Sequence, residues 1–397
     1  MQNNRAGILF EGGFRVFFLG AAIYAALTMT LWSLQMSGSF EILERIIQIP
    51  LPVWHAHELI FGFIVAVVAG FLTTAVPVWT NTPRVRGVQL ITLFVLWLAG
   101  RLAMDFSAYI PLQLTAIIDL LFMPALALTI AVPIIKKKLW KNLGFIPLLL
   151  LLMGGNALIH LENIGWLADT AGIGIRLSIG LLVLMTVIIG GRVIPFFTQN
   201  WLKRHGKQVV VTAPSWITKV VILSSVITVS ANSLVNDELL LTVLNTLTGV
   251  FILLRLSYWK GLSTVEDPVM FILHVGYALI GLSFLANAAA ISTDFFPEIL
   301  AQHIFTIGGL GVMILGMMSR IALGHTGRPL EIHWLTSASY VFIILALASR
   351  IIPMLYLPEF YSLGLIIAGS SWIIAWILHL IIYTPILLSP RPDGKEG

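Results

Sequence analysis

The sequence predicts an all-α, polytopic integral membrane protein with about twelve transmembrane helices and both termini in the cytoplasm. Of its 397 residues, 58% are hydrophobic and only 10% are charged, whereas a soluble domain averages about 25% charged residues. Apolar runs of about 20 residues recur along the chain, long enough for a helix to cross a bilayer core of about 30 Å. The runs lack the period-two alternation of a membrane β-barrel. A soluble enzyme is therefore excluded.

The expected spans follow one another with short loops between them. The first run follows a basic start but has no small-residue cleavage site, so we interpret it as a retained helix rather than a signal peptide. Tryptophans near the run ends, such as Trp54 and Trp79, are typical of interfacial anchors. The longest polar stretch is the loop around residues 203–212, so we expect a single transmembrane domain, 1–397. The twelve spans are expected at 14–36, 55–79, 86–104, 110–133, 140–160, 172–195, 213–232, 238–258, 269–292, 298–322, 333–352 and 361–388.

The distribution of Lys and Arg predicts the orientation, because short loops rich in these residues stay in the cytoplasm. With both termini inside, only Arg45, Arg101, Arg176 and Arg350 of the 23 basic residues lie outside. The net charge of +5 does not indicate nucleic-acid binding, because the basic residues are scattered between apolar runs.

Histidines are the most informative polar residues of the predicted spans. The chain has no cysteine, so any metal site depends on imidazole, thioether or carboxylate ligands. The topology places His55, His57, His160 and His303 at one depth, near the outer face. Two histidines on separate helices can hold a haem between them. A histidine at such a depth can also simply bond a lipid headgroup or a backbone carbonyl.

The spacing of His55 and His57 limits how they act together. Residues two apart on a regular helix point about 200° away from each other, so one site cannot easily use both. Glu58 could orient a ligating imidazole through a hydrogen bond. An ionisable group costs about 2.5 to 3.5 kcal/mol at the centre of a membrane helix, so Glu58 and Asp119 are notable as buried acids.

Helices 2 and 10 match at a shift of 246 residues, the difference between 57 and 303. Five identities support an internal repeat of helices 2–3 with helices 10–11. The identical pairs are His57 and His303, Gly62 and Gly308, Gly70 and Gly316, Thr80 and Thr326, and Pro83 and Pro329. Small residues at such positions allow close helix approach. Asp119 and the arginines near helix ends, among them Arg101, Arg192 and Arg320, either pair with one another, contact haem propionates or extend to the headgroups.

Several stretches of the chain resemble the NnrS family of bacterial membrane proteins. They are WHAHELIFGFIVAVVAGFLTTAVPVWTNTP at 54–83, FRVFFLGAAIYAAL at 14–27, GGRVIPFFTQN at 190–200, HVGYALIGL at 274–282, HIFTIGGLGVMILGMMSRIALGHTGRPL at 303–330 and YTPILLSPRPDGKEG at 383–397. The resemblance implies an inner-membrane protein of the nitric oxide response that carries haem and copper. The haem would be b-type, because the chain lacks the cysteines of a CxxCH site.

From these patterns we expect a haem between His57 and His303, with His274 and His325 as further candidate ligands. His55, His160 and Glu58 are expected near copper or another second metal, and Arg192 and Arg320 near the propionates. The ligand would be nitric oxide or another small neutral molecule, which reaches an embedded centre through the lipid bilayer. The ligands leave open whether nitric oxide is reduced, with electrons from an unidentified donor, sensed or sequestered.

Two other functions remain alternatives at this point. A secondary transporter also has twelve helices, but its two six-helix halves should align helix 1 with helix 7, and the observed match joins helices 2 and 10. A haem or metal assembly factor would bind the metal loosely and turn nothing over.

Overall fold

The computed structural model describes residues 5–38, 41–207 and 209–394. The described residues form helices and connecting loops, with no strand among them, and twelve helical spans are long and apolar enough to cross a membrane. This result confirms the predicted fold class. The first four and last three residues, on which the predictions about the termini fall, lie outside the described residues. The spans are Gly13–Met36, Leu51–Thr80, Val88–Asp105, Leu112–Lys136, Trp140–Asn163, Ala171–Arg204, Ser215–Leu234, Glu238–Ser257, Pro268–Ser292, Glu298–His325, Trp334–Tyr356 and Pro358–Leu387.

The chain divides into two compact units. The first comprises residues 1–178, 318–335 and 376–397, and the second comprises 179–317 and 336–375. The elements of the first unit are α1 (Arg5–Leu9), α2 (Gly13–Met36), α3 (Ile42–Ile46), α4 (Leu51–His57), η1 (Glu58–Ile64), α5 (Val65–Thr80), α6 (Val88–Asp105), η2 (Ser107–Tyr109), α7 (Leu112–Leu120), α8 (Phe122–Lys136), η3 (Trp140–Asn142) and α9 (Phe145–Asn163). The expected single domain stays a prediction.

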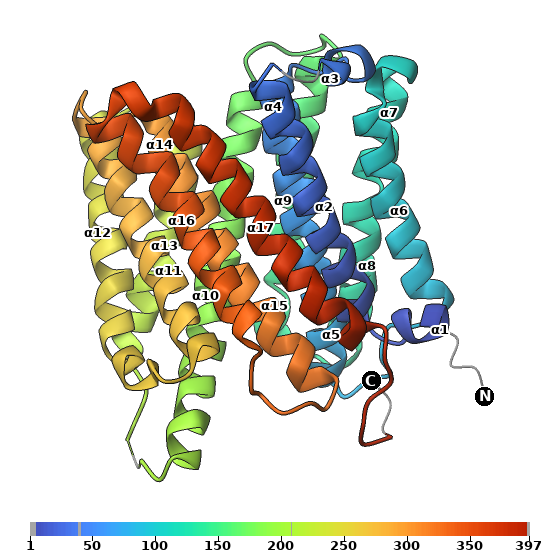
Figure 1. Cartoon of the computed structure of the whole chain (residues 1–397), viewed down its shortest axis with the longest axis vertical. Helices are drawn as coiled ribbons and strands as arrows, with labels where there is room; N and C mark the ends of the chain where they lie inside the picture. The colour runs from blue at the N-terminus through green and yellow to red at the C-terminus, as the bar shows by residue number, and fades with distance from the viewer. Residues whose placement is uncertain (1–4, 39–40, 208, 395–397) are drawn as a thin grey trace. The chain divides into compact units, whose positions relative to one another are not determined.

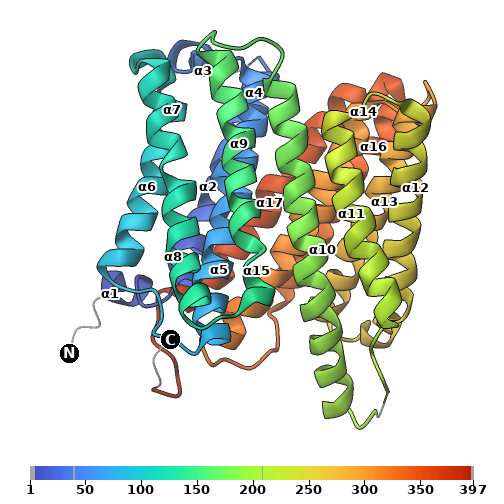
Figure 2. The ribbon, with the colours of Figure 1, turned by 180° about the vertical axis from the view of Figure 1, so that it is seen from behind.

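The first unit also contains the start of α10 (Ala171–Arg204) and the ends of α15 (Val312–His325) and α17 (Tyr361–Leu387). Within it, α2 packs against α5 and η1, and α6 packs against α7 (Figure 1). Seen from behind, α8 and α9 run side by side (Figure 2). These contacts bring residues from α2, α4, η1, α6, α7 and α9 into one interior.

The second unit is built around a pair of neighbouring helices, α12 (Glu238–Ser257) and α13 (Pro268–Ser292). Helix α11 (Ser215–Leu234) packs against α12, and α13 packs against α14 (Glu298–His303) and η5 (Ile304–Gly311). The remaining elements are η4 (Gly261–Thr264), α16 (Trp334–Tyr356) from Thr336 onward and η6 (Pro358–Phe360), with the other parts of α10, α15 and α17.

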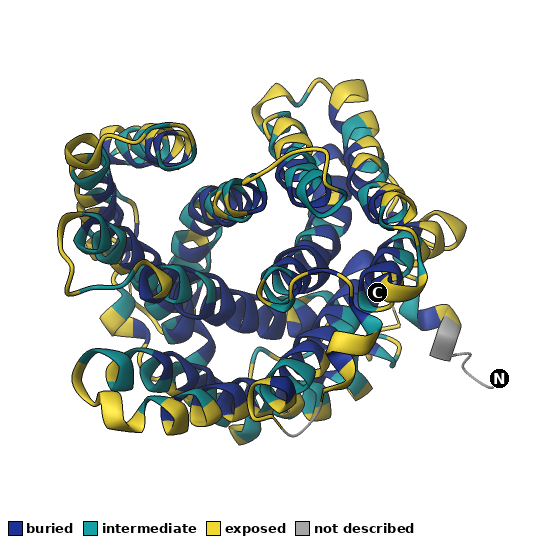
Figure 3. Cartoon of the chain, turned by 90° about the horizontal axis from the view of Figure 1, so that it is seen from above, coloured by how far each residue is buried: buried dark blue, intermediate teal, exposed yellow. Residues whose placement is uncertain are grey.

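The helices carry buried and exposed residues on different faces (Figure 3). Exposed positions along the spans include large apolar side chains such as Val95 on α6, Leu247 on α12 and Ile381 on α17. The buried positions include charged groups such as Glu58 and Arg101. This distribution is typical of a protein in a lipid bilayer. Lipid tails solvate exposed apolar side chains well, whereas exposure of a charged side chain to them costs free energy.

Two spans contain a π-helix at matching positions. The π-helix η1 starts directly after His57, and the π-helix η5 starts directly after His303. Glu58 and Ile304, their first residues, are related by the same shift of 246, the difference between 304 and 58. Long π-helices are rare and occur often at functional sites, so their coincidence supports the internal repeat, which remains a prediction.

Candidate metal centre

A cluster of buried polar side chains lies inside the first unit. His57 at the end of α4 and Glu58 at the start of η1 are each 0% exposed, and His160 on α9 is 2% exposed. Arg101 on α6 and Asp119 on α7 are each 3% exposed. Four separate spans therefore contribute to one site that water does not reach.

Local sequence explains how Asp119 reaches this site. Helix α7 ends at Leu120 and α8 begins at Phe122, because Pro124 has no N–H to donate to the carbonyl four residues earlier. A side chain on Gly100 would lie 2.7 Å from Asp119 Oδ1 and 3.2 Å from Asp119 Cα. The absence of a side chain at Gly100 therefore lets α6 and α7 approach closely at the carboxylate.

Three metal-binding side chains converge at the centre of the cluster. Asp119 Oδ2 lies 3.0 Å from His160 Nε2 and 3.2 Å from His57 Nε2. The ligand atoms of His57, Asp119 and His160 all lie within 4.8 Å of one another. Two imidazole nitrogens and one carboxylate oxygen form a set that suits copper, zinc or iron. The donor chemistry therefore fits a transition-metal ion.

Asn156 lies beside these three residues and completes the inner network. Its Oδ1 lies 2.7 Å from His57 Nε2, and its Nδ2 donates to Asp119 Oδ2 over 2.7 Å. On the other side of the ring, His57 Nδ1 lies 2.7 Å from Glu58 Oε1. Both ring nitrogens of His57 thus face oxygen acceptors, which requires a hydrogen on each nitrogen. Metal binding at Nε2 would exchange that hydrogen for the ion.

Arg101 provides the fixed positive charge of the cluster. Its Nη1 donates to both oxygens of Glu58 at 2.7 Å, and its Nη2 donates to Asp119. One guanidinium thus faces two carboxylates. A second positive charge balances the pair, and it is supplied either by a proton on His57 or by a metal ion.

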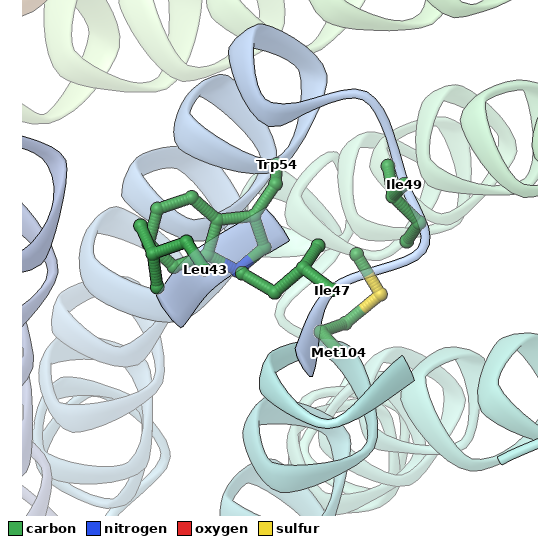
Figure 4. Close-up of a cluster of buried hydrophobic side chains, with 5 residues drawn as sticks. All are labelled: Leu43, Ile47, Ile49, Trp54 and Met104. Atoms are coloured by element: carbon green, nitrogen blue, oxygen red, sulfur yellow. The ribbon is translucent and has the colours of Figure 1, made fainter. Parts of the chain in front are cut away.

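The network extends from Glu58 toward the end of α6. The Tyr24 hydroxyl donates to Glu58 and lies 3.2 Å from both oxygens of Asp105. Trp54 Nε1 also donates to Asp105, over 3.0 Å. Trp54 belongs to a buried apolar cluster that covers this end of the network (Figure 4) and whose members are Leu43, Ile47, Ile49, Trp54 and Met104.

The structure brings together three of the residues that the sequence predicted for a site, namely His57, Glu58 and His160. His55 does not join them, because its ring stacks on Trp32 with centroids 4.4 Å apart. The different surroundings of His55 and His57 agree with their two-residue spacing on α4.

The other candidate ligands have separate surroundings. In the second unit, His303 Nδ1 lies 2.7 Å from Ile299 O. His274 Nδ1 lies 2.8 Å from Met270 O, and its Nε2 lies 3.2 Å from Thr198 Oγ1. In the first unit, the His325 ring packs on Phe14 at 5.4 Å. His57 and His303 belong to different units, so the haem pair stays a prediction.

The predicted propionate contacts differ in exposure. Arg192 is exposed on α10, and Arg320 is buried on α15 at 8% exposure. The role of both arginines stays a prediction.

Sequence reasoning missed part of the cluster. Asp119 and Arg101 were considered as a pair, beside the alternative that each extends to the headgroups, and the structure shows the pair. Asn156 and Tyr24 are not among the residues that the sequence indicated, and Asp105, expected in an outer loop, is the last residue of α6 and joins the network. Asn156 is a polar residue in the middle of an apolar run, and the desolvation cost of its amide could have identified it.

Comparison with known families agrees with the resemblance. The family model described as NnrS protein matches residues 8–391, almost the whole chain. A comparison with curated proteins returned no match. The match and the twelve spans identify a multi-pass membrane protein of the nitric oxide response.

Proposed function

The chain belongs to the NnrS family, and we propose that it is an inner-membrane protein that meets nitric oxide at an embedded metal centre. The metal is held by His57, Asp119 and His160. The observation that carries this proposal is the convergence of their ligand atoms within 4.8 Å in a fully buried site. Both termini lie in the cytoplasm in this proposal, as the Lys and Arg distribution predicts.

Copper is the metal that we propose for this centre. The ligand set accepts several transition metals, and the family resemblance selects copper among them. Copper(I) and ferrous haem both bind nitric oxide. Nitric oxide is small, uncharged and soluble in lipid, so it can reach the site through the apolar faces of the helices without a polar pore.

The surrounding residues orient and balance the ligands. Glu58 accepts from His57 Nδ1 and so directs Nε2 toward Asp119, which is the usual role of a carboxylate behind a ligating histidine. Arg101 holds Glu58 and Asp119 in place at the same time. The ligands are therefore positioned before the metal binds.

A b-type haem is the second cofactor of the proposal. Each ring nitrogen of His57 already has a hydrogen-bond partner, Glu58 at Nδ1 and Asn156 at Nε2. A haem bound to His57 must displace one of these partners, so the site fits a single metal ion better than a macrocycle. The haem pair His57 and His303 therefore competes with the metal centre for the His57 ring. His274 and His325 are the other proposed haem ligands.

Metal analysis and absorption spectra of the purified protein test both parts. We expect His160→Ala and Asp119→Asn to lower the copper content at least tenfold, since each removes one of three ligands. His205→Ala is the matched control, because His205 is not one of the cluster residues. Its Nδ1 lies 2.8 Å from the carbonyl oxygen of Trp201. Copper at wild-type stoichiometry in both cluster variants would exclude this centre.

The proposed haem ligands are tested by the absorption spectra of His57→Ala and His303→Ala. If both variants lose the Soret band while His160→Ala keeps it, His57 binds haem and not copper. Anaerobic nitric oxide consumption with a reductant, followed by measurement of N2O, distinguishes an NO-reducing enzyme from a protein that senses or sequesters the gas. A protein with neither metal nor Soret band would favour the transporter.

A further inference from the structure

Arg15 is a fully buried arginine near the start of α2, in the first unit. It is 0% exposed, and its Nη1 donates to Leu387 O over 2.5 Å and to Ser389 O over 2.9 Å. Its Nε and Nη2 are also buried, and neither has a hydrogen-bond partner among the described residues. Two donor nitrogens of one charged group thus lack an acceptor among the described residues, which is unfavourable unless an anion accepts from them.

Three further arginines lie close enough to Arg15 for their charges to act on its guanidinium group. They are Arg84 between α5 and α6, Arg328 after α15 and Arg391 after α17, and Glu11 is the acidic residue that acts on Arg15. Arg391 donates to Asp393 through two bonds, over 2.9 and 2.6 Å. Among the described residues, the ion pairs include none with Arg15.

The four arginines, which we call the arginine cluster, come from the same end of the first unit. All lie at or just beyond the ends of membrane spans, where the headgroups of a bilayer lie. Arg391 Nη1 also donates to His325 O over 3.0 Å. Gly327, with a φ of +67°, leaves room for this contact, because a side chain there would lie 3.0 Å from Arg391 Nη2.

We propose that the arginine cluster binds a phosphate-bearing anion. Phosphate oxygens accept strong charge-assisted bonds from guanidinium groups, and basic pockets between helix ends bind the headgroups of anionic lipids. The two sources of this chemistry are an anionic phospholipid and free phosphate. The position at the span ends favours the lipid. The proposal is independent of the metal centre, whose residues lie on other parts of the helices.

Thermal unfolding of the full-length protein in detergent, with added ligand, tests this proposal. We expect phosphatidylglycerol to raise the midpoint by on the order of 5 °C at a hundredfold excess over its Kd, and phosphatidylcholine to raise it far less. An equal rise with inorganic phosphate would support the site and assign it to free phosphate. Equal shifts with both phospholipids and none with phosphate would overturn the proposal.

The variants identify the site. The double substitution Arg84→Gln and Arg328→Gln should raise the apparent Kd for phosphatidylglycerol about tenfold, because two cationic donors are removed. Arg86→Gln is the matched control from the same loop and should leave the Kd unchanged, since Arg86 is not among the residues that act on Arg15. Arg15→Gln removes the buried donors, and the double variant carries the test if Arg15→Gln does not fold. An unchanged Kd in the double variant would contradict the assignment.

Discussion

At the scale of single residues, Arg101 is the group on which the buried cluster depends. It donates to Glu58 and Asp119 and so links the two acids through a permanent positive charge. His57 completes the charge balance between them. A group that joins two buried carboxylates cannot be removed without leaving negative charge in a medium of low polarity. Arg101 therefore supports both the fold and the ligand Asp119.

Arg101→Leu is expected to destabilise the protein by about 3 to 5 kcal/mol, the range for breaking a buried ion pair on one side. Chemical unfolding in detergent, followed by circular dichroism, measures the change. Arg176→Leu is the control, because Arg176 is an exposed arginine on α10, and its removal should change stability by less than about 1 kcal/mol. Equal losses in the two variants would show that the buried network contributes little.

At the scale of elements, the two π-helices lie at positions that the predicted internal repeat relates to each other. His57 precedes η1, and His303 precedes η5. At the same shift of 246 residues, however, Glu58, Arg101 and Asp119 correspond to Ile304, Leu347 and Leu365. The two matched segments therefore share the histidine and the π-helix, whereas the acids and the arginine stand only at the first set of positions. This difference explains why His57 and His303 have such different surroundings.

The contact between α9 and α10 depends on one of two adjacent glycines. A side chain on Gly155 would lie 2.4 Å from Ser178 Oγ and 3.1 Å from Gly174 O, whereas one on Gly154 would meet nothing within 4 Å. Gly155→Ala should therefore cost about 1 to 3 kcal/mol through overpacking. Gly154→Ala should be neutral, or stabilise α9 by up to about 1 kcal/mol.

Unfolding midpoints of the two glycine variants check this prediction. Because Asn156 follows Gly155 directly, the copper content of Gly155→Ala should also fall. A midpoint for Gly155→Ala as high as that of Gly154→Ala would mean that the helices separate at this position without cost.

At the scale of the whole molecule, the exterior differs from that of a soluble protein, because large apolar side chains are exposed along the spans. Large apolar side chains lie on the outside, and the acids and arginines of the cluster lie inside. Hydrocarbon cannot solvate a charge, so charged groups must find partners within the protein. Charged residues make up 10% of the chain, and the buried ones among the described residues have partners within the protein, as Arg101 has in the first unit and Arg255 in the second.

The orientation can be tested directly because the chain has no cysteine. Trp166, between α9 and α10, and Lys137, after α8, are both exposed. The predicted topology places Trp166 outside the cytoplasm and Lys137 inside. Trp166→Cys should react with a membrane-impermeant maleimide in intact cells with an opened outer membrane. Lys137→Cys should react only after the inner membrane is permeabilised, and the reverse pattern would refute the orientation.

The sequence by itself determined the class and the number of spans. A helix must cover about 30 Å with apolar residues, and this requirement is local, so each run could be recognised without its neighbours. The predicted start of the second span at residue 55 was four residues later than the observed Leu51, because Pro52 and Trp54 extend the helix outward. His57, Glu58 and His160 were also recognisable, since ionisable groups are rare in membrane spans.

Only the tertiary structure decided which of these groups meet. His57, Asp119 and His160 are separated by about 40 to 60 residues along the chain, and no local pattern relates helices α4, α7 and α9. The site arises because Gly100 lets α6 approach Asp119 and because His55 packs on Trp32 while His57 faces the interior. Sequence periodicity shows which residues are polar, but the packing of separate helices selects the partners of each buried charge.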